Sequence, residues 1–130
     1  MNYAYKKQVN LSFEDAVAKT REALKKEGFG IITEIDVTGV VKNKLGVDFD
    51  KYIILGACNP PFAHKALEAE KDVGLLMPCN LVVYEDNGKT FVAATRPTVT
   101  MGIVGNPALA PLGTQVEEKL KKAVDSVSSG

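Results

Sequence analysis

The hydrophobic pattern predicts two long amphipathic helices, one near each end of the chain. In residues 13–26 apolar side chains recur every three or four positions, and charged side chains fill the remaining face, which is typical of a helix packed on one side. Ser12 is expected to cap this helix and Gly28 to end it. A capping box of Thr114 and Glu117 predicts the start of the second helix, with Glu117 on its charged face. The apolar stripe of that helix consists of Leu112 or Val116, Leu120, Val124 and Val127.

Runs of β-branched and aromatic residues predict the strands. They occupy residues 3–9, 29–36, 51–57, 81–84 and 90–95. The turn sequence Asp86-Asn87-Gly88 joins the last two as a hairpin, so these strands are expected to be antiparallel neighbours. Residues 98–104 are expected to form a further strand or a loop crossing the end of the sheet.

Two shorter helices are predicted between the strands. In residues 37–46 the apolar positions Val37, Val40, Val41 and Leu45 have helical spacing. A second helix is expected from about Pro60 to Glu70, because Asn59 is a favoured cap and proline is favoured in a first helical turn. The order of elements indicates an α+β fold: an antiparallel or mixed sheet of about five to six strands, packed against two main helices plus a shorter one.

Composition limits the classes of function. The 130 residues fit one domain, residues 1–130, and 45% of them are hydrophobic. Sixteen basic and sixteen acidic residues give no net charge, so neither nucleic acid nor an anionic membrane surface is expected as a partner. The apolar runs are far shorter than the roughly 20 residues that span a bilayer. Without an apolar signal segment at the N-terminus, we expect a cytoplasmic protein with reduced thiols.

Candidate chemistry gathers between residues 52 and 84, which contain both cysteines and the only histidine. Cys58 ends an apolar strand just before a helix N-terminus, where the thiol pKa could be lowered toward a reactive thiolate. We favour the plainer interpretation that Cys58 packs as a small hydrophobic residue. If the strands that end at Cys58 and begin after Pro78 are neighbours, the two cysteines could approach the Cα separation of about 5.5 Å found in disulfides. The Cys-x-x-Cys spacing of thioredoxin-like motifs is absent.

The two asparagines and the histidine support weaker hypotheses. Asn59 is expected to act mainly as a helix cap, whereas for Asn80 a structural and a ligand-holding role stay open. His64 follows Cys58 by six positions, so a three-ligand metal site of Cys58, Cys79 and His64 is one hypothesis. Their spacing matches no standard zinc pattern. A solvent-facing histidine is the favoured interpretation, and no metal or cofactor is expected.

The chain resembles the bacterial and archaeal family known as domain of unknown function 302. The resemblance rests on Gly56-Ala57-Cys58-Asn59-Pro60, the helix around Ala63, Ala66 and Leu67, the segment from Gly74 to Asn80, and Val82-Val83-Tyr84-Glu85. It covers nearly the whole chain. It implies a compact α+β domain similar in layout to the TATA-box-binding-protein-like folds, with a curved sheet packed on helices, and commonly dimeric. It implies no established activity, and a likeness of fold alone does not transfer function.

Three hypotheses follow. In the first, the protein is a small binding domain that holds a small molecule in a cleft lined by Cys58, Asn59, Pro60, Pro78, Cys79 and Asn80. In the second, it is a thiol enzyme or redox sensor in which Cys58 is the low-pKa thiol and Cys79 its resolving partner. In the third, it is an accessory subunit that forms a homodimer through an exposed strand edge or an apolar helix face.

Overall fold

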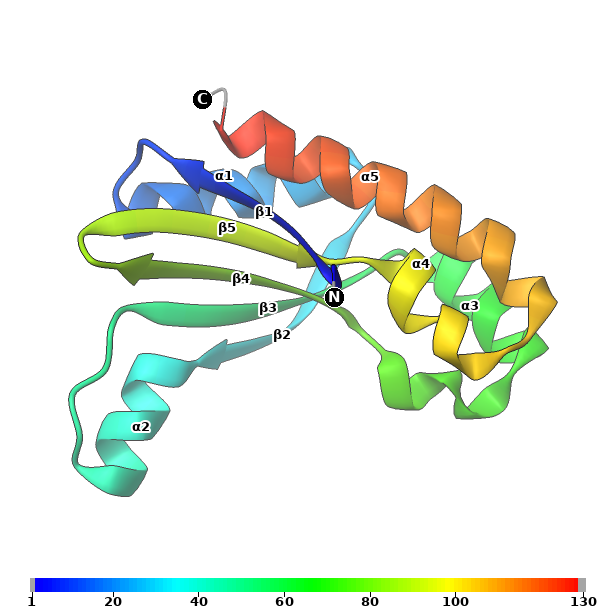
Figure 1. The fold of residues 1–130 in the computed structure, drawn as a ribbon, viewed down its shortest axis with the longest axis horizontal. Coiled ribbons are helices and arrows are strands. Elements are labelled where there is room, and N and C mark those ends of the chain that lie inside the picture. Colours follow the sequence, from blue (N-terminus) through cyan, green and yellow to red (C-terminus); the bar gives the residue numbers. More distant parts are fainter. Residues whose placement is uncertain (1, 129–130) are drawn as a thin grey trace.

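The computed structural model describes residues 2–128, which form a five-stranded sheet with helices (Figure 1). In chain order the strands and helices are β1 (Ala4–Val9), α1 (Phe13–Lys26), β2 (Gly30–Asp36), α2 (Val37–Leu45), β3 (Tyr52–Cys58), α3 (Pro60–Ala69), β4 (Cys79–Asp86), β5 (Lys89–Thr95), α4 (Pro97–Thr100) and α5 (Ala110–Ser128). Short 3-10 helices occupy Lys71–Leu76, Gly102–Val104 and Pro107–Leu109.

The sheet is antiparallel throughout, with the strand order β1-β5-β4-β3-β2. Helices α1 and α5 pack on one another and against the same side of the sheet (Figure 1). The predicted α+β class is therefore confirmed, with five strands and only antiparallel pairs. The opposite side of the sheet is called the open face below.

The main core lies between the sheet and helices α1 and α5. Alternate strand residues point toward these helices because successive side chains of a strand face opposite sides. The members of this layer are almost completely buried, and they include Val9, Leu24, Leu55, Leu81, Val83, Val92, Leu120, Val124 and Val127. A smaller cluster of Ala66, Val73, Met101 and Leu109 lies beside it, where α3 and the start of α5 meet.

Several local predictions are confirmed by contacts. The hydroxyl oxygen of Ser12 accepts a hydrogen bond of 3.1 Å from the backbone N–H of Asp15, which caps α1. In the β4–β5 hairpin, Asn87 and Gly88 have φ values of 52° and 77°, the left-handed conformations that an Asn-Gly turn supplies. Strands β3 and β4 are neighbours, as the hypothesis of a shared cysteine site required.

Of the two alternatives predicted for residues 98–104, a strand or a loop crossing the end of the sheet, the strand does not form. Pro97 begins the short helix α4, and a 3-10 turn follows from Gly102. The carboxylate of Glu117 accepts a 3.0 Å hydrogen bond from the backbone N–H of Thr98 and a 2.6 Å bond from its hydroxyl. A side chain of α5 therefore satisfies the polar groups at the start of α4, so this segment needs no strand partner.

The capping box predicted at Thr114 and Glu117 is also wrong. Helix α5 already begins at Ala110, and the Thr114 hydroxyl donates to the Ala110 carbonyl at 3.2 Å, inside the helix. Glu117 was expected on the charged face but is only 5% exposed. An acidic residue can be buried in this way because Arg96, from the end of β5, pairs with it.

Helix α2 forms where it was predicted, but its apolar positions have no core to join. The side chain of Asp36 accepts from the Gly39 N–H at 3.1 Å, and Gly46, at φ 66°, ends the helix. No residue of α2 is buried. The helix extends from the β2 edge of the sheet, on the side of the molecule opposite α5 (Figure 1). Within residues 2–128 no helix has both the length and the apolar content needed to cross a membrane.

Candidate functional site

A cavity of about 340 Å³ lies at the end of the sheet, between β3, β4, α3 and the start of α5. Its walls come from both the main core and the smaller cluster, so it occupies the junction between them. The lining residues share an apolar character: Phe29, Ile32, Ala57, Cys58, Asn59, Phe62, Ala63, Ala66, Leu67, Met77, Pro78, Cys79, Met101, Leu112 and Val116. Among these residues none is charged, and Asn59 carries the only amide side chain.

Strand pairing brings both cysteines to this cavity. In the β3–β4 register Ala57 lies opposite Cys79, so Cys58 is one position beyond that pair. Both thiols are free and half-buried, and both line the cavity. Cys58 and Cys79 therefore lie on the wall of the same cavity, as the hypothesis of a shared site expected, and no disulfide joins them.

The environment of Cys79 keeps its thiol protonated. Burial raises the pKa of Cys79 to about 11, and the nearby Cys58 adds to the rise because two thiolates would repel one another. Only a thiolate is nucleophilic, so Cys79 attacks slowly near neutral pH. Any thiol chemistry in this cavity would have to begin at Cys58.

Close packing fixes the start of β4 against β3. A Cβ atom added to Gly56 would lie 2.7 Å from Cγ of Pro78 and would also collide with the Thr33 hydroxyl. Glycine at this position therefore lets the Pro78 ring approach the β3 backbone. The Met77–Pro78 peptide bond is cis. These contacts place Met77, Pro78 and Cys79 together on the cavity wall.

Asn59 lines the cavity but is not the predicted side-chain cap. It occupies the residue before α3, yet its side chain makes no capping hydrogen bond to that helix. Its amide nitrogen instead donates to the Glu27 carbonyl, at 3.4 Å, beyond the end of α1. Pro60 and Pro61 remove two N–H groups that a cap would otherwise satisfy, which leaves Asn59 available for this tertiary contact.

Three other candidate residues lie away from the cavity. Asn80 follows Cys79 in β4, so it points to the open face, where it lines a separate groove with Tyr52 and Tyr84. Pro60 is exposed and is absent from the cavity wall. His64 is exposed on α3, 3.7 Å from Glu68, and the described residues contain no group of three His, Cys, Asp or Glu side chains that could hold a metal ion. The three-ligand site suggested for Cys58, Cys79 and His64 is therefore not assembled.

Sequence reasoning missed most of the cavity wall. Phe29, Met101 and Val116 come from segments that are remote from residues 52–84 and that look like ordinary core positions. The sulfur-containing residues are one sequence signal that could have identified this wall, because Met77 and Met101 line the cavity together with the two cysteines. The chain has two cysteines and three methionines, and four of these five residues lie on this wall; Met1 is outside the described residues.

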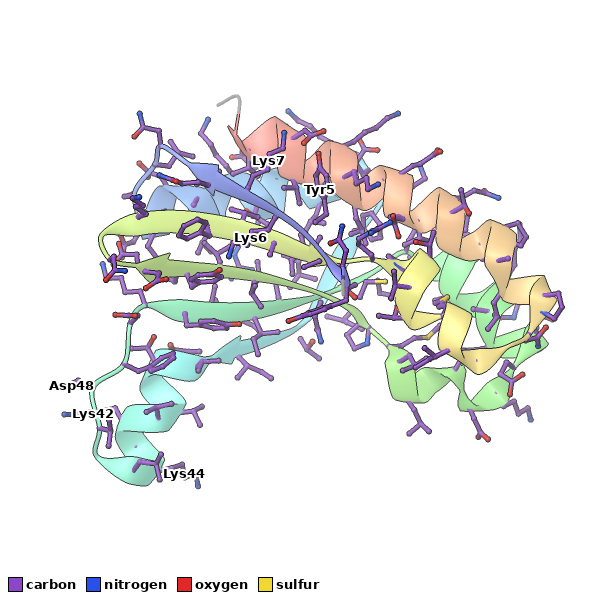
Figure 2. The ribbon with its side chains drawn as sticks, in the orientation of Figure 1. Tyr5, Lys6, Lys7, Lys42, Lys44 and Asp48 are labelled. Carbon is purple, nitrogen blue, oxygen red and sulfur yellow. The ribbon has the colours of Figure 1, made fainter. Side chains whose placement is uncertain are left out.

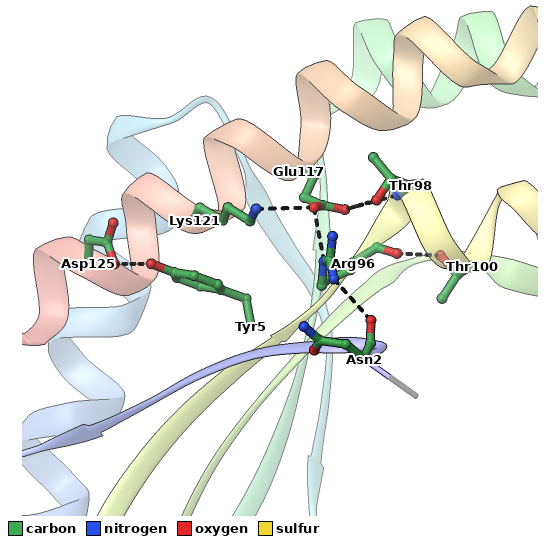
Figure 3. A network of polar contacts seen from close by, with 8 residues as sticks. All are labelled: Asn2, Tyr5, Arg96, Thr98, Thr100, Glu117, Lys121 and Asp125. Carbon is green, nitrogen blue, oxygen red and sulfur yellow. Dashed lines mark hydrogen bonds and ion pairs between the residues drawn. The ribbon is translucent and has the colours of Figure 1, made fainter.

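A polar cluster is centred on the buried side chain of Glu117, next to Val116 of the cavity wall, and Figure 3 shows its contacts. Glu117 pairs with Arg96 at 3.0 Å and with Lys121 at 3.3 Å, and it accepts from Thr98. Burial alone would raise the pKa of Glu117, but hydrogen bonds from Thr98, Arg96 and Lys121 outweigh it and lower the pKa to about 2. The cluster joins the end of β5 to α4 and α5, and Val116, the residue before Glu117, is part of the cavity wall.

Comparisons with known proteins agree with the fold. The family model described as "Domain of unknown function DUF302" matches residues 5–127. A crystal structure of an uncharacterised conserved DUF302 protein from Bacillus stearothermophilus matches with a TM-score of 0.91 and 33% sequence identity, covering 97% of this chain and 98% of that one. No curated protein matches the chain.

Proposed function

The chain belongs to the DUF302 family, whose description assigns no activity, and we propose that it binds a small, uncharged and largely apolar molecule in the cavity at Cys58 and Cys79. The observation that carries the proposal is the apolar cavity of about 340 Å³ onto which Cys58, Asn59, Pro78 and Cys79 converge. Its volume is within the range of roughly 300–1,000 Å³ typical of small-molecule sites.

The lining sets the charge of the ligand. Transfer of an unpaired charge into an apolar site costs several kcal/mol or more, and the described wall offers no charged side chain to offset that cost. A hydrophobic chain or ring with one hydroxyl or carbonyl group fits better, because Asn59 offers a single amide at the wall. The two methionines favour the same class, since flexible thioethers adapt to irregular apolar shapes.

Retention of the cavity also supports a binding role. The cavity opens to solvent and leaves apolar side chains such as Phe62 and Met77 only half-buried, which costs free energy when no ligand covers them. It lies where two hydrophobic clusters meet, so larger side chains at Ala63 or Ala66 could have narrowed it. Residues that leave such a space open are typical of positions where function offsets a cost in stability.

Titration with n-octanol tests the proposal. The probe is uncharged and carries one hydroxyl, and saturable binding should appear as chemical-shift changes of Cys58, Phe62 and Met101 together with a rise in melting temperature. Octanoate, which has the same chain length and a negative charge, serves as the matched control and should bind at least about tenfold more weakly. The variant Ala63→Leu, which fills part of the cavity, should weaken n-octanol binding. Absence of saturable binding, or binding unchanged by Ala63→Leu, would refute the proposal.

A thiol redox role is the second candidate, and the presence of both free thiols on one wall is what supports it. The raised pKa of Cys79 makes Cys58 the thiol that reacts first, and it also slows the resolving step, in which the Cys79 thiolate must attack the mixed disulfide at Cys58 and release the small thiol. Equilibration of the protein in glutathione buffers of known potential provides the test. Formation of a Cys58–Cys79 disulfide within the cellular range of potentials would support this role, and mixed disulfides at Cys58 alone would contradict it.

A further inference from the structure

The open face of the sheet carries a groove of about 430 Å³, and we propose that this groove binds a planar aromatic carboxylate. The groove is formed by residues of β1, β3, β4 and β5 together with the two residues before β1, and it shares no lining residue with the cavity at Cys58 and Cys79. Its volume is within the range of roughly 300–1,000 Å³ typical of small-molecule sites. The groove is therefore a second site, and it does not depend on the function proposed for the cavity.

The residues of the open face are not those of a sheet surface that only meets water. In an antiparallel sheet with one solvated face, the outward positions are usually polar. Strands β4 and β5 instead place apolar and aromatic side chains there: Val82, Tyr84, Phe91 and Ala93. The strand register sets the small Ala93 between Lys6 of β1 and Val82 of β4. Small side chains thus form an apolar floor, and a contiguous apolar surface of this kind is typical of a binding site.

Aromatic rings form one wall of the groove. Tyr52 stacks on Tyr84 with 5.3 Å between ring centroids and an angle of 11° between the ring planes, and Tyr84 stacks on Phe91 at 5.4 Å. These cross-strand pairs stabilise the sheet, but both tyrosines line the groove and are only half-buried. Tyr3, which is 64% exposed, lines the same groove. A planar aromatic ligand fits here because offset stacking stabilises aromatic pairs at centroid distances of about 4.5–7 Å.

Lys6 is the only charged residue of the groove lining. Its Nζ lies 4.8 Å from the centre of the Phe91 ring and 5.5 Å from that of Tyr84. Its neighbours in β1, Tyr5 and Lys7, point to the other side of the sheet, where both contact α5 (Figure 2). A ligand stacked on the rings would therefore meet one cation. This arrangement matches a single carboxylate better than the many charges of a nucleic acid.

The surroundings of Lys6 leave it available to an anion. The Tyr84 side chain, and to a smaller extent Asp86, raise the pKa of Lys6, so Lys6 is charged at neutral pH. Asp86 lies at the hairpin end of β4, outside the groove lining. Among residues 2–128 Lys6 forms no ion pair, and its contacts are with rings. A carboxylate can join these contacts without displacing another carboxylate.

A hydrogen-bonding group lies at the other end of the groove. Asn80 is exposed on β4, and its amide has no hydrogen-bond partner in the described part of the chain. It is four residues from Tyr84, or about 13 Å along the strand. Two fused rings fit between the Lys6 and Asn80 ends, and a hydroxyl on the far ring would meet the amide, which both donates and accepts. The groove thus gives Asn80 a role that the cavity does not.

Titration with 6-hydroxy-2-naphthoate tests the proposal, because this probe combines two fused rings, one carboxylate and a hydroxyl. Saturable chemical-shift changes should appear at Lys6, Asn80 and Tyr84. The methyl ester, which has no charge, and the decahydro analogue, which has no aromatic ring, should each bind at least about tenfold more weakly. Saturating n-octanol should leave the affinity unchanged, so the outcome is independent of binding in the cavity.

Substitutions on the two sides of β1 provide the matched comparison. Lys6→Gln should weaken binding of 6-hydroxy-2-naphthoate at least about tenfold, whereas Lys7→Gln, at the neighbouring position on the other side of the sheet, should leave it unchanged. Asn80→Ala should weaken binding of the hydroxylated probe but not of 2-naphthoate, which lacks the hydroxyl. Lys6 and Asn80 are both exposed, so these variants should fold, and circular dichroism checks that they do.

Several results would overturn the proposal. They are an absence of saturable binding, shift changes confined to cavity residues such as Phe62 and Met101, or equal losses in Lys6→Gln and Lys7→Gln. Tighter binding of a single-stranded oligothymidylate than of 6-hydroxy-2-naphthoate would assign the open face to a nucleic acid instead, since stacked rings also suit unpaired bases. An affinity that falls as the protein concentration rises would assign the open face to a second copy of the chain.

Discussion

Glu117 shows how one residue can join three elements that the sequence presents as separate. Its carboxylate meets Arg96 from the end of β5, Thr98 from α4 and Lys121 from its own helix (Figure 3). A buried carboxylate with this many donors is stabilised in its charged form. Because the pKa of Glu117 lies near 2 in the folded protein and near the ordinary 4.5 in the unfolded chain, the charged form stabilises the fold above pH 4.5.

We predict that Glu117→Gln lowers the free energy of unfolding by about 2 to 3 kcal/mol at pH 7, since the pKa shift corresponds to about 3 kcal/mol. The stabilisation by Glu117 is lost as the pH falls from about 4.5 toward 2, so the wild type and the variant should converge over that interval. Urea denaturation at a series of pH values measures both effects. Glu118→Gln, at an exposed neighbouring position, is the control. A difference that stays constant with pH would contradict the role of the carboxylate.

Cys79 gives a second prediction at the residue scale. In a Cys58→Ser variant, iodoacetamide should modify Cys79 at pH 8 at least about tenfold more slowly than in the urea-unfolded chain, because burial raises the pKa of Cys79 above its ordinary value. The rate in the folded protein should still be rising above pH 9, where the unfolded chain levels off. Mass spectrometry of the alkylated protein follows the reaction. Equal folded and unfolded rates would show that the thiol is not shielded.

At the residue scale, the sequence indicated which side chains make structural contacts better than it indicated the residues that they contact. Ser12 caps a helix as predicted, because a cap contacts a backbone group only three residues away. Asn59 and Glu117 were assigned local capping roles that tertiary contacts replace, to Glu27 in one case and to Arg96 in the other. Asn80 was grouped with Cys79 by adjacency, although neighbours in a strand face opposite sides. Contacts between residues far apart in the chain determine the roles of all three residues. A single sequence does not specify those contacts.

At the scale of elements, the contact between β3 and the segment before β4 is the most sensitive to a single methyl group. Gly56→Ala should destabilise the protein by about 1 to 3 kcal/mol, because the new Cβ would meet the Pro78 ring and the Thr33 hydroxyl. Gly30→Ala, in the neighbouring strand β2, has no atom within 4 Å of its added Cβ and should be close to neutral. Thermal unfolding of the two variants compares them. Equal effects would mean that the approach of Pro78 to β3 is not tight.

Helices and strands with a strong hydrophobic periodicity or a clear turn sequence were predictable. Segments whose structure depends on contacts with other elements were not. Helix α1 and the β4–β5 hairpin follow from spacing and turn residues alone. The segment 98–104 has the β-branched content of a strand, but the carboxylate of Glu117 accepts hydrogen bonds from Thr98 and stabilises the start of a short helix there. Helix α2 was found from its period, yet the same period did not reveal that its apolar side would lie outside the core.

At the scale of the whole molecule, the resemblance and the residue patterns both led to the α+β class, which the antiparallel sheet and its helices confirm. Layout similar to TATA-box-binding-protein-like folds stays a prediction, as does the cytoplasmic location. The cavity could be anticipated only in part. Its two cysteine segments are visible in the sequence, whereas Phe29, Met101 and Val116 reach the same wall only because the core folds in two clusters with a gap between them.

That gap leads to the last prediction. If the cavity is kept open for a ligand, narrowing it should make the molecule more stable. Ala63 is half-buried in the cavity wall, and Ala63→Leu adds three carbons that occupy part of the cavity. At about 0.8 kcal/mol per buried methylene, less the lost side-chain entropy, we expect a gain of about 1 to 2 kcal/mol in the free energy of unfolding.

Ala69→Leu, at an exposed position of the same helix and outside the cavity wall, is the matched control and should change stability by less than about 0.5 kcal/mol. Urea denaturation of both variants without ligand makes the comparison. A gain confined to Ala63→Leu, the variant expected to bind n-octanol more weakly, would show that stability and binding compete for the same space. If Ala63→Leu instead destabilises the protein as overpacking of a full core does, the space is not available to a ligand of that size.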